Sequence, residues 1–281
     1  VPTLPQKDEA GEPIRTDGKL VLEHPLTAAD LGDGAKTAAG ERELLAGAQL
    51  LHHPSAGSLY LNFYYDLGHV KPENMQYLDL LTDVLDELDS SAHTAQQLNT
   101  LRSTWLGDSR VQLDIWTGRQ EGAPCHAKLS LCLSLLERSL EKAVELGGEW
   151  LYDTRLTGPA AEAAFARVLS QQKLNMEQQF IQQGNAYAAT RASAHYSVDG
   201  AVSERCSGVS YYKFLCDLLA KADWAALGAR LDALRTEVLQ NAQLTVSLYG
   251  SEDALAKLRS LLPGSRFAAE GRREAVPYTE P

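Results

Sequence analysis

Regular alternation of apolar and polar residues predicts four β-strands in this chain. Residues 58–66 (SLYLNFYYD) place every second side chain on one apolar face, as in a strand that is buried on one side. Residues 110–118 and 126–134 alternate in the same way, and the glycines and proline between them favour an antiparallel pair. Residues 243–250 form the fourth predicted strand.

Apolar residues at intervals of three and four predict helices over most of the remaining folded region. The predicted helices cover residues 72–89, 94–105, 136–146, 159–183, 203–219, 224–238 and 251–262. Gly147-Gly148 is expected to end the third of these helices, and Gly184-Asn185 to interrupt the long Gln-rich one. Helices grouped in blocks between the strands predict an α+β fold, with an antiparallel sheet covered by helices on one side.

Composition divides the chain into three regions. Residues 1–43 are rich in Pro and Gly, which predicts a linker or extended arm with one short strand at residues 20–26. Residues 44–263 contain the other predicted strands and the helices, and we expect them to form the α+β module. Residues 264–281 are a charged tail and are expected to be a linker toward a following module.

The charge balance limits the kinds of partner. The 281 residues include 26 Lys and Arg against 37 Asp and Glu, which gives a formal net charge of −11. This excess of negative charge argues against nucleic acid or an anionic membrane as a partner, because both attract positive charge. No apolar run approaches the ~18 residues that a membrane-spanning helix needs, and no signal peptide opens the sequence, so we expect a cytoplasmic protein.

The cysteines and histidines form no metal or redox motif. The four cysteines, at positions 125, 132, 206 and 216, have neither CxxC nor zinc-ribbon spacing, which favours buried thiols in a reducing compartment. A helical zinc-peptidase site needs two His one turn apart beside a Glu, and neither HExxH nor the inverted HxxEH occurs. We therefore expect no metal and no cofactor on this chain.

The stretch from residue 170 to 219 combines polar, small and aromatic residues and supplies the candidate site. Substrate contact is expected for Arg191, His195 and Tyr211, with Tyr212 as the alternative to Tyr211. Two interpretations remain open, since these side chains could line a pocket or could pack and cap helix ends. Helix packing is favoured because no nucleophile paired with a base is recognisable.

Two segments carry a resemblance to a known family. Residues 58–91, ending in NMQYLDLLTDVLDELDSS, and residues 104–116 (TWLGDSRVQLDIW) resemble the opening of a module of the pitrilysin (insulinase) family of zinc metallopeptidases, in particular its presequence-protease branch. The stretch from 170 to 219 is similar to the third module of that branch, with the patterns GHxxAxxRAxAxxS and ExxxGxxYxxFL. The matching residues are Gly184, Ala188, Arg191, Ala192, Ala194, Ser197, Glu204, Gly208, Tyr211, Phe214 and Leu215, whereas Asn185 stands where His is common.

The resemblance implies a LuxS/MPP-like metallohydrolase fold and a non-catalytic role. In this family the zinc ligands belong to the N-terminal module, and the helix at residues 73–89 occupies the place of the zinc helix without any His. The chain is thus expected to be a third module that forms part of the wall of a peptide-degrading chamber and contacts peptide substrates. Its expected partners are the N-terminal catalytic half and a following C-terminal module of the same protein.

Two other functions remain open at this stage. The chain could be a stand-alone inactive scaffold or binding subunit of the same superfamily, or a metal-independent enzyme that uses Arg191, His195 and Tyr211. The module and the scaffold are both predicted to be inactive alone. An HxxEH motif upstream in the same reading frame would identify the module, whereas loss of an activity on substitution of His195 would favour the enzyme.

Overall fold

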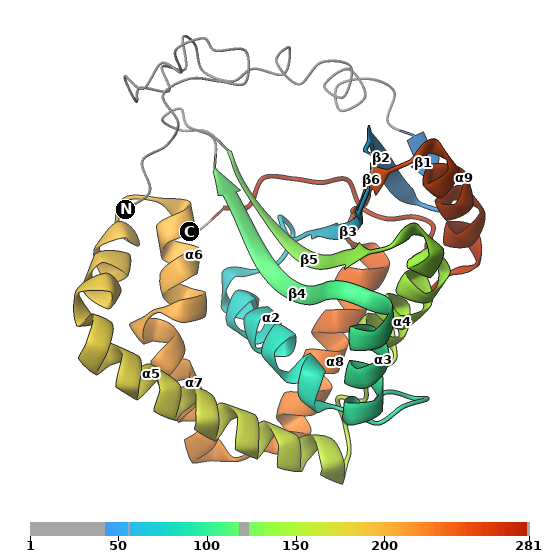
Figure 1. Cartoon of the computed structure of the whole chain (residues 1–281). Coiled ribbons are helices and arrows are strands. Elements are labelled where there is room, and N and C mark those ends of the chain that lie inside the picture. Colours follow the sequence, from blue (N-terminus) through green and yellow to red (C-terminus); the bar gives the residue numbers. More distant parts are fainter. Residues whose placement is uncertain (1–42, 56, 118–123, 280–281) are drawn as a thin grey trace, which may run out of the picture. The chain divides into compact units, whose positions relative to one another are not determined.

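A computed structural model of the chain describes residues 43–55, 57–117 and 124–279. Within these residues six strands form one sheet in the order β1-β2-β6-β3-β5-β4 (Figure 1). The strands are β1 (Glu43–Leu45), β2 (Ala48–Pro54), β3 (Leu59–Asp66), β4 (Leu106–Thr117), β5 (Cys125–Leu135) and β6 (Leu244–Gly250). The four strands predicted from alternation are β3 to β6. The predicted linker and its short strand at residues 20–26 lie outside the described residues, apart from the first residue of β1.

The sheet is mixed rather than wholly antiparallel, which corrects the prediction. β3 is antiparallel to both neighbours, so Phe63 lies opposite Leu131 of β5 and Val246 of β6. β6 enters the sheet between β2 and β3 and runs parallel to β2, with Leu50 opposite Val246. Because the chain reverses direction between β2 and β3, a strand that is antiparallel to β3 must be parallel to β2. The sequence pattern does not predict β2, because the adjacent Leu50 and Leu51 and the buried His52 break the alternation of apolar and polar residues.

Helices cover one face of the sheet (Figure 1). They are α2 (Pro72–Val84), α3 (Ala95–Trp105), α4 (Leu140–Tyr152), α5 (Pro159–Ser193), α6 (Val198–Ser207), α7 (Val209–Lys221), α8 (Trp224–Asn241) and α9 (Glu252–Leu261), with short 3-10 helices η2 (Leu85–Glu87), η3 (Glu137–Ser139) and η4 (Leu262–Gly264). On the covered face Leu61, Phe63 and Leu131 are fully buried, while Tyr60 and Trp116 on the opposite face are exposed. The α+β fold, with helices on one side of the sheet, is confirmed.

Helix α4 runs through Gly147-Gly148, so the prediction that this pair ends the helix is wrong. The two glycines allow close packing instead. A Cβ atom on Gly147 would lie 3.2 Å from a methyl group of Leu131, and one on Gly148 would lie 3.2 Å from Cβ of Arg266. The helix tolerates two glycines, each less favourable than Ala by about 1 kcal/mol, because the sheet and the C-terminal segment pack directly on its backbone.

The predicted interruption of the long helix is present as a kink. Helix α5 continues to Ser193, but Gln183 has non-helical φ and ψ values of −132° and 32°. The predicted helix at 203–219 is in fact two helices, α6 and α7, separated at Gly208. Helix α6 begins earlier than predicted, because Ser197 Oγ accepts a hydrogen bond from the backbone N–H of Gly200 at 3.1 Å and caps the helix there.

Residues 265–279 pack against the module, which differs from the extended linker expected for this tail. The Phe267 ring is buried and stacks on Phe63, with ring centroids 3.8 Å apart. Further along, Tyr278 is buried and its backbone N–H donates to the carbonyl oxygen of Cys125 at 2.7 Å. The folded module therefore extends past residue 263, because two aromatic side chains of the tail complete its core. That another module follows stays a prediction.

Candidate functional site

Arg191 near the end of α5 ties three helices together. Its Nη1 donates to Glu204 Oε1 of α6 at 2.7 Å and to Ser210 Oγ of α7 at 3.2 Å. The same Glu204 oxygen accepts the backbone N–H of Ser210 at 3.1 Å, so the carboxylate caps α7 in place of the missing side chain of Gly208. A Cβ atom on Gly208 would lie 2.0 Å from the other Glu204 oxygen. Helix capping by Glu204 and the lack of room for a side chain at Gly208 therefore explain these two residues of the family pattern.

Tyr211 points into the helix layer. The side chain is buried, and its hydroxyl lies 3.4 Å from Asp83 Oδ2 of α2 and 3.5 Å from Gln172 Oε1 of α5. Burial raises the pKa of Tyr211 well above its usual value, and the nearby carboxylates of Asp79 and Asp83 raise it further. A phenol with so high a pKa stays protonated near neutral pH and acts as a hydrogen-bond donor between α7, α2 and α5.

The candidate site residues do not form one site. His195 lies exposed in the turn after α5, where its backbone N–H donates to the Ala192 carbonyl oxygen at 3.1 Å. Tyr212 faces α5 and donates to Glu177 Oε1 at 2.7 Å. Arg191 is occupied by its contacts on α6 and α7, and Tyr211 by those on α2 and α5. The geometry supports helix packing for Arg191 and Tyr211, and substrate contact at all three positions stays a prediction.

Helix α2 has the place that the resemblance assigns to the zinc helix. It carries Asp79 and Asp83 one turn apart and no His. Burial raises the pKa of Asp79 well above its usual value, and the neighbouring Asp83 adds to the rise; burial also raises the pKa of Asp83. Among the described residues, no three or more His, Cys, Asp or Glu side chains lie together in an arrangement that could hold a metal ion.

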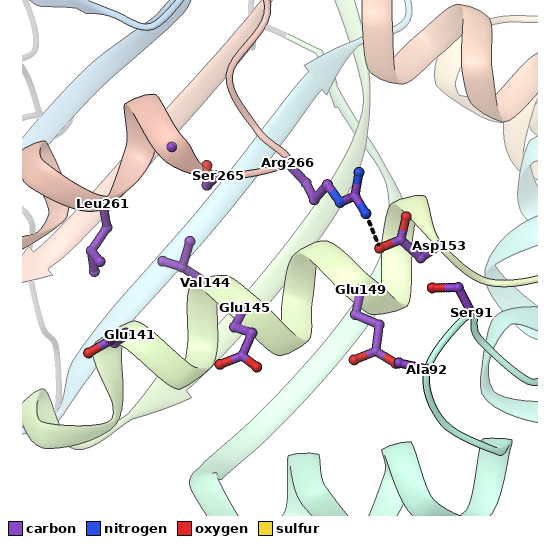
Figure 2. Close-up of a pocket in the computed structure, with 11 residues that line it drawn as sticks. Ser91, Ala92, Glu141, Val144, Glu145, Glu149, Asp153, Leu261, Ser265 and Arg266 are labelled. Carbon is purple, nitrogen blue, oxygen red and sulfur yellow. Dashed lines mark ion pairs between the residues drawn. The ribbon is translucent and has the colours of Figure 1, made fainter.

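An acidic cleft of about 700 Å³ runs along α4 (Figure 2). Glu141, Glu145, Glu149 and Asp153 follow one another at intervals of four residues and lie on one stripe of the helix. The opposite wall comes from the end of α9 and the segment after it, where Arg266 pairs with Asp153 at 3.0 Å. We call this the α4 cleft. The spacing of the four acids is visible in the sequence, although no motif considered above marks it.

The four carboxylates of the α4 cleft differ in accessibility. Glu149 is the most buried, and its Oε1 accepts hydrogen bonds from Ser90 Oγ and, at 2.8 Å, from His93 Nδ1. Glu141 and Glu145 are exposed, and Glu145 forms a salt bridge with Lys142 at 2.6 Å. The inner end of the stripe is therefore fixed by hydrogen bonds, whereas at the outer end Glu141 presents its charge to solvent and Glu145 shares its charge with Lys142. Such a cleft attracts cationic groups.

The comparisons with known proteins agree with this fold. Residues 26–218 match the family described as peptidase M16 (subfamily C) associated. Over 228 residues the chain is 26% identical to presequence protease 1, chloroplastic/mitochondrial, of Arabidopsis thaliana, a match that covers 77% of this chain and 21% of that protein. The chain spans about a fifth of the length of the curated relatives it matches.

Solved structures share the fold at low sequence identity. A conserved protein from Enterococcus faecalis V583 has a TM-score of 0.59 at 15% identity, over 85% of this chain and 55% of that one. The first half of the periplasmic protease PqqL from Escherichia coli has a TM-score of 0.56 at 13% identity, over 85% and 48% of the two chains. Within the described residues no helix combines the length and apolar character needed to span a bilayer. The chain belongs to the peptidase M16 (subfamily C) associated family and is a non-catalytic module of the pitrilysin type.

Proposed function

We propose that this chain is the third module of a zinc-dependent, presequence-protease-like peptidase, where it forms part of the wall of a peptide-degrading chamber and contacts the peptide substrates. The observation that carries the proposal is α2, which has the place of the zinc helix in the module pattern but contains no His. Family membership and the name of the Arabidopsis relative support it.

The partners in this proposal belong to the same protein. The chain would sit between an N-terminal catalytic half, whose HxxEH helix holds the zinc, and a following C-terminal module. The length of the relatives, of which the chain covers about a fifth, supports a multi-module parent. A cytoplasmic location stays our prediction, although the name of the Arabidopsis relative places that protein in chloroplasts and mitochondria.

The α4 cleft supports contact with basic peptides. Among the described residues that line it, four are carboxylates and one, Arg266, is a cation, which pairs with Asp153; Lys142 outside the lining pairs with Glu145. In a chain with a net charge of −11, this stripe concentrates negative potential at a concave surface. Each exposed ion pair with a peptide contributes only about 0.2–1 kcal/mol, so the contact is not specific for sequence and weakens with salt. These are the properties that a wall for many different basic peptides requires.

Turnover assays test the non-catalytic role. The full chain is incubated with zinc and a basic, presequence-like peptide, and the products are followed by mass spectrometry. We expect no cleavage above the background of the peptide alone, because α2 cannot supply a zinc ligand set. Cleavage that is abolished by a chelator would contradict the proposal. Cleavage that is insensitive to chelator but lost in a His195→Ala variant would instead support the metal-independent enzyme.

The stand-alone scaffold is the remaining alternative, and the gene separates it from the module. An HxxEH motif upstream of this segment in the same reading frame supports a module of one long peptidase. A separate gene for the catalytic protein, together with co-purification of the two chains, would support an inactive partner subunit.

A further inference from the structure

A second cleft, of about 400 Å³, lies where strands β3, β4 and β5 meet η3. We call it the sheet-end cleft. Three large apolar side chains line it and remain exposed: Tyr60 at 50%, Trp105 at 40% and Leu136 at 52%. Aromatic rings left open to water around a concave surface indicate a contact site for an apolar group, because such rings normally lose their water-facing area in the core or in an interface.

The charge of the sheet-end cleft is opposite to that of the α4 cleft. Within the part of the chain that the structure describes, Arg138 is the one charged residue of its lining, and no Asp or Glu lines it. Among the described residues the Arg138 guanidinium has no ion pair or hydrogen bond, whereas Arg102, Arg110 and Arg167 each pair with a carboxylate. An unpaired guanidinium in a cleft without acids is a receptor for a carboxylate, which it can bind through two parallel hydrogen bonds.

The hydroxyl of Ser139 adds a second polar group to the sheet-end cleft. Ser139 is only 4% exposed, yet it lines the cleft. Its Oγ has no hydrogen-bond partner among the described residues and, as the last residue of η3, it makes no cap hydrogen bond for α4. The Oγ is not among the fully buried polar atoms that lack a partner, so it reaches the open side of the cleft and is available to a bound group.

Paired strands and buried side chains hold the backbone around this cleft in place. Leu106 and Leu135 form a buried floor and lie opposite each other in the sheet. The register of β4 against β5 shifts between Leu106 and Asp108, so Gly107 is the extra residue of a bulge, and a Cβ on it would lie 3.0 Å from Ser134 Oγ. A site held by paired strands keeps its groups in place better than a loop does.

We propose that the sheet-end cleft binds the carboxyl terminus of a peptide whose last side chain is apolar or aromatic. Arg138 pairs with the terminal carboxylate, Ser139 donates a hydrogen bond to it, and Trp105, Tyr60 and Leu136 enclose the last side chain. Capture of a peptide terminus by a few fixed donors is a known mode of recognition. The inference rests on the proposed function, since it assigns one end of the same class of peptide ligand to a defined site.

A pair of probes tests this assignment on the full chain. N-acetyl-Ala-Ala-Ala-Phe is titrated as the free acid and as the C-terminal amide, with calorimetry for affinity and the indole NMR signal of Trp105 as the local probe. We expect the free acid to bind about ten-fold tighter or more, because a hydrogen bond to a charged group is lost in the amide. An Arg138→Ala variant should remove this preference, while Arg110→Ala, which removes an exposed Arg outside the cleft, should keep it.

The outcomes separate this inference from the proposed function. Equal binding of acid and amide, no binding of either, or a preference that survives Arg138→Ala would overturn the sheet-end assignment. A basic, amidated presequence-like peptide, which lacks a carboxylate end, tests contact with substrates on its own. If that peptide binds and the acid shows no preference, the wall function stands without the sheet-end site. If only the acid binds through Arg138, the site stands and contact with basic peptides is wrong.

Discussion

The α4 cleft and the sheet-end cleft belong to one module but have opposite charge. Counting the described residues, the α4 cleft presents four carboxylates and one Arg, whereas the sheet-end cleft presents one Arg and no acid. In a chain with 37 acidic and 26 basic residues, an acidic surface is the ordinary case, so the cleft without acids is the more informative one. Under the proposed function, a peptide would be held differently at its basic side chains and at its carboxyl end. Variants that act on one cleft alone test this difference.

The largest expected effect is the loss of stability caused by Phe267→Ala. This variant removes a buried ring next to Arg266, which lines the α4 cleft. The Phe267 ring is buried between Phe63 and Tyr152, directly after Arg266. Loss of a buried Phe is expected to reduce the free energy of unfolding by about 3–5 kcal/mol, measured by urea denaturation. The control is Tyr196→Ala, whose ring is exposed and whose loss should change stability by less than about 0.5 kcal/mol. Equal effects of the two variants would contradict the packed C-terminal segment.

A smaller effect on stability is expected from Glu204→Ala. Together with Arg191→Ala, this variant tests whether Arg191 belongs to a third peptide-binding region. The variant removes the cap of α7 and leaves Arg191 without its carboxylate partner. We expect a loss of about 1–3 kcal/mol in the free energy of unfolding. Arg191→Ala should lower stability less, because its side chain is half-exposed. A drop in peptide affinity with little change in stability in Arg191→Ala would support the predicted substrate contact, whereas an unchanged affinity would contradict it.

Charge removal in the α4 cleft should weaken a basic peptide only moderately. The double variant Glu141→Gln, Glu145→Gln keeps the size of both exposed side chains and removes two charges. We expect affinity for a basic, amidated peptide to fall about three- to ten-fold at low salt, because each exposed pair contributes about 0.2–1 kcal/mol. Calorimetry at two salt concentrations measures the effect. The free-acid probe of the sheet-end cleft should bind unchanged, and an equal loss for both probes would mean that the clefts are not independent.

The smallest expected effect concerns the pH dependence of stability. It comes from the acidic residues of α2, which face other helices, unlike those of the α4 cleft. Burial raises the pKa of Asp79 above its ordinary value of 3.8, so the folded state binds a proton that the unfolded state releases. Stability should therefore fall as the pH rises from about 3.8 through the raised pKa. Asp79→Asn should remove this part of the decline and be more stable than the parent near neutral pH, with no gain below the ordinary pKa. Thermal unfolding across pH measures it, and a parallel decline in both proteins would contradict it.

Local patterns were sufficient for most of the secondary structure. Alternation in residues 58–66 predicts β3, and the apolar spacing of residues 94–105 predicts α3, which Thr94 caps. These features depend on neighbours in the sequence, so they can be read without the fold. Gly147-Gly148 shows the limit of such reading. A glycine pair ends many helices, but here it lies inside one, where Leu131 and Arg266 closely approach the helix backbone.

Residue types at short spacing were enough to predict the α+β class, the family, and the lack of a zinc motif on the helix at residues 72–89. The positions of the candidate groups follow from the folded structure. It placed Arg191 on Glu204 and Tyr211 beside Asp83, and it brought Tyr60, Trp105 and Arg138 to one cleft. These contacts join segments far apart in the chain, and their geometry follows from sheet register and helix packing, which no local pattern encodes.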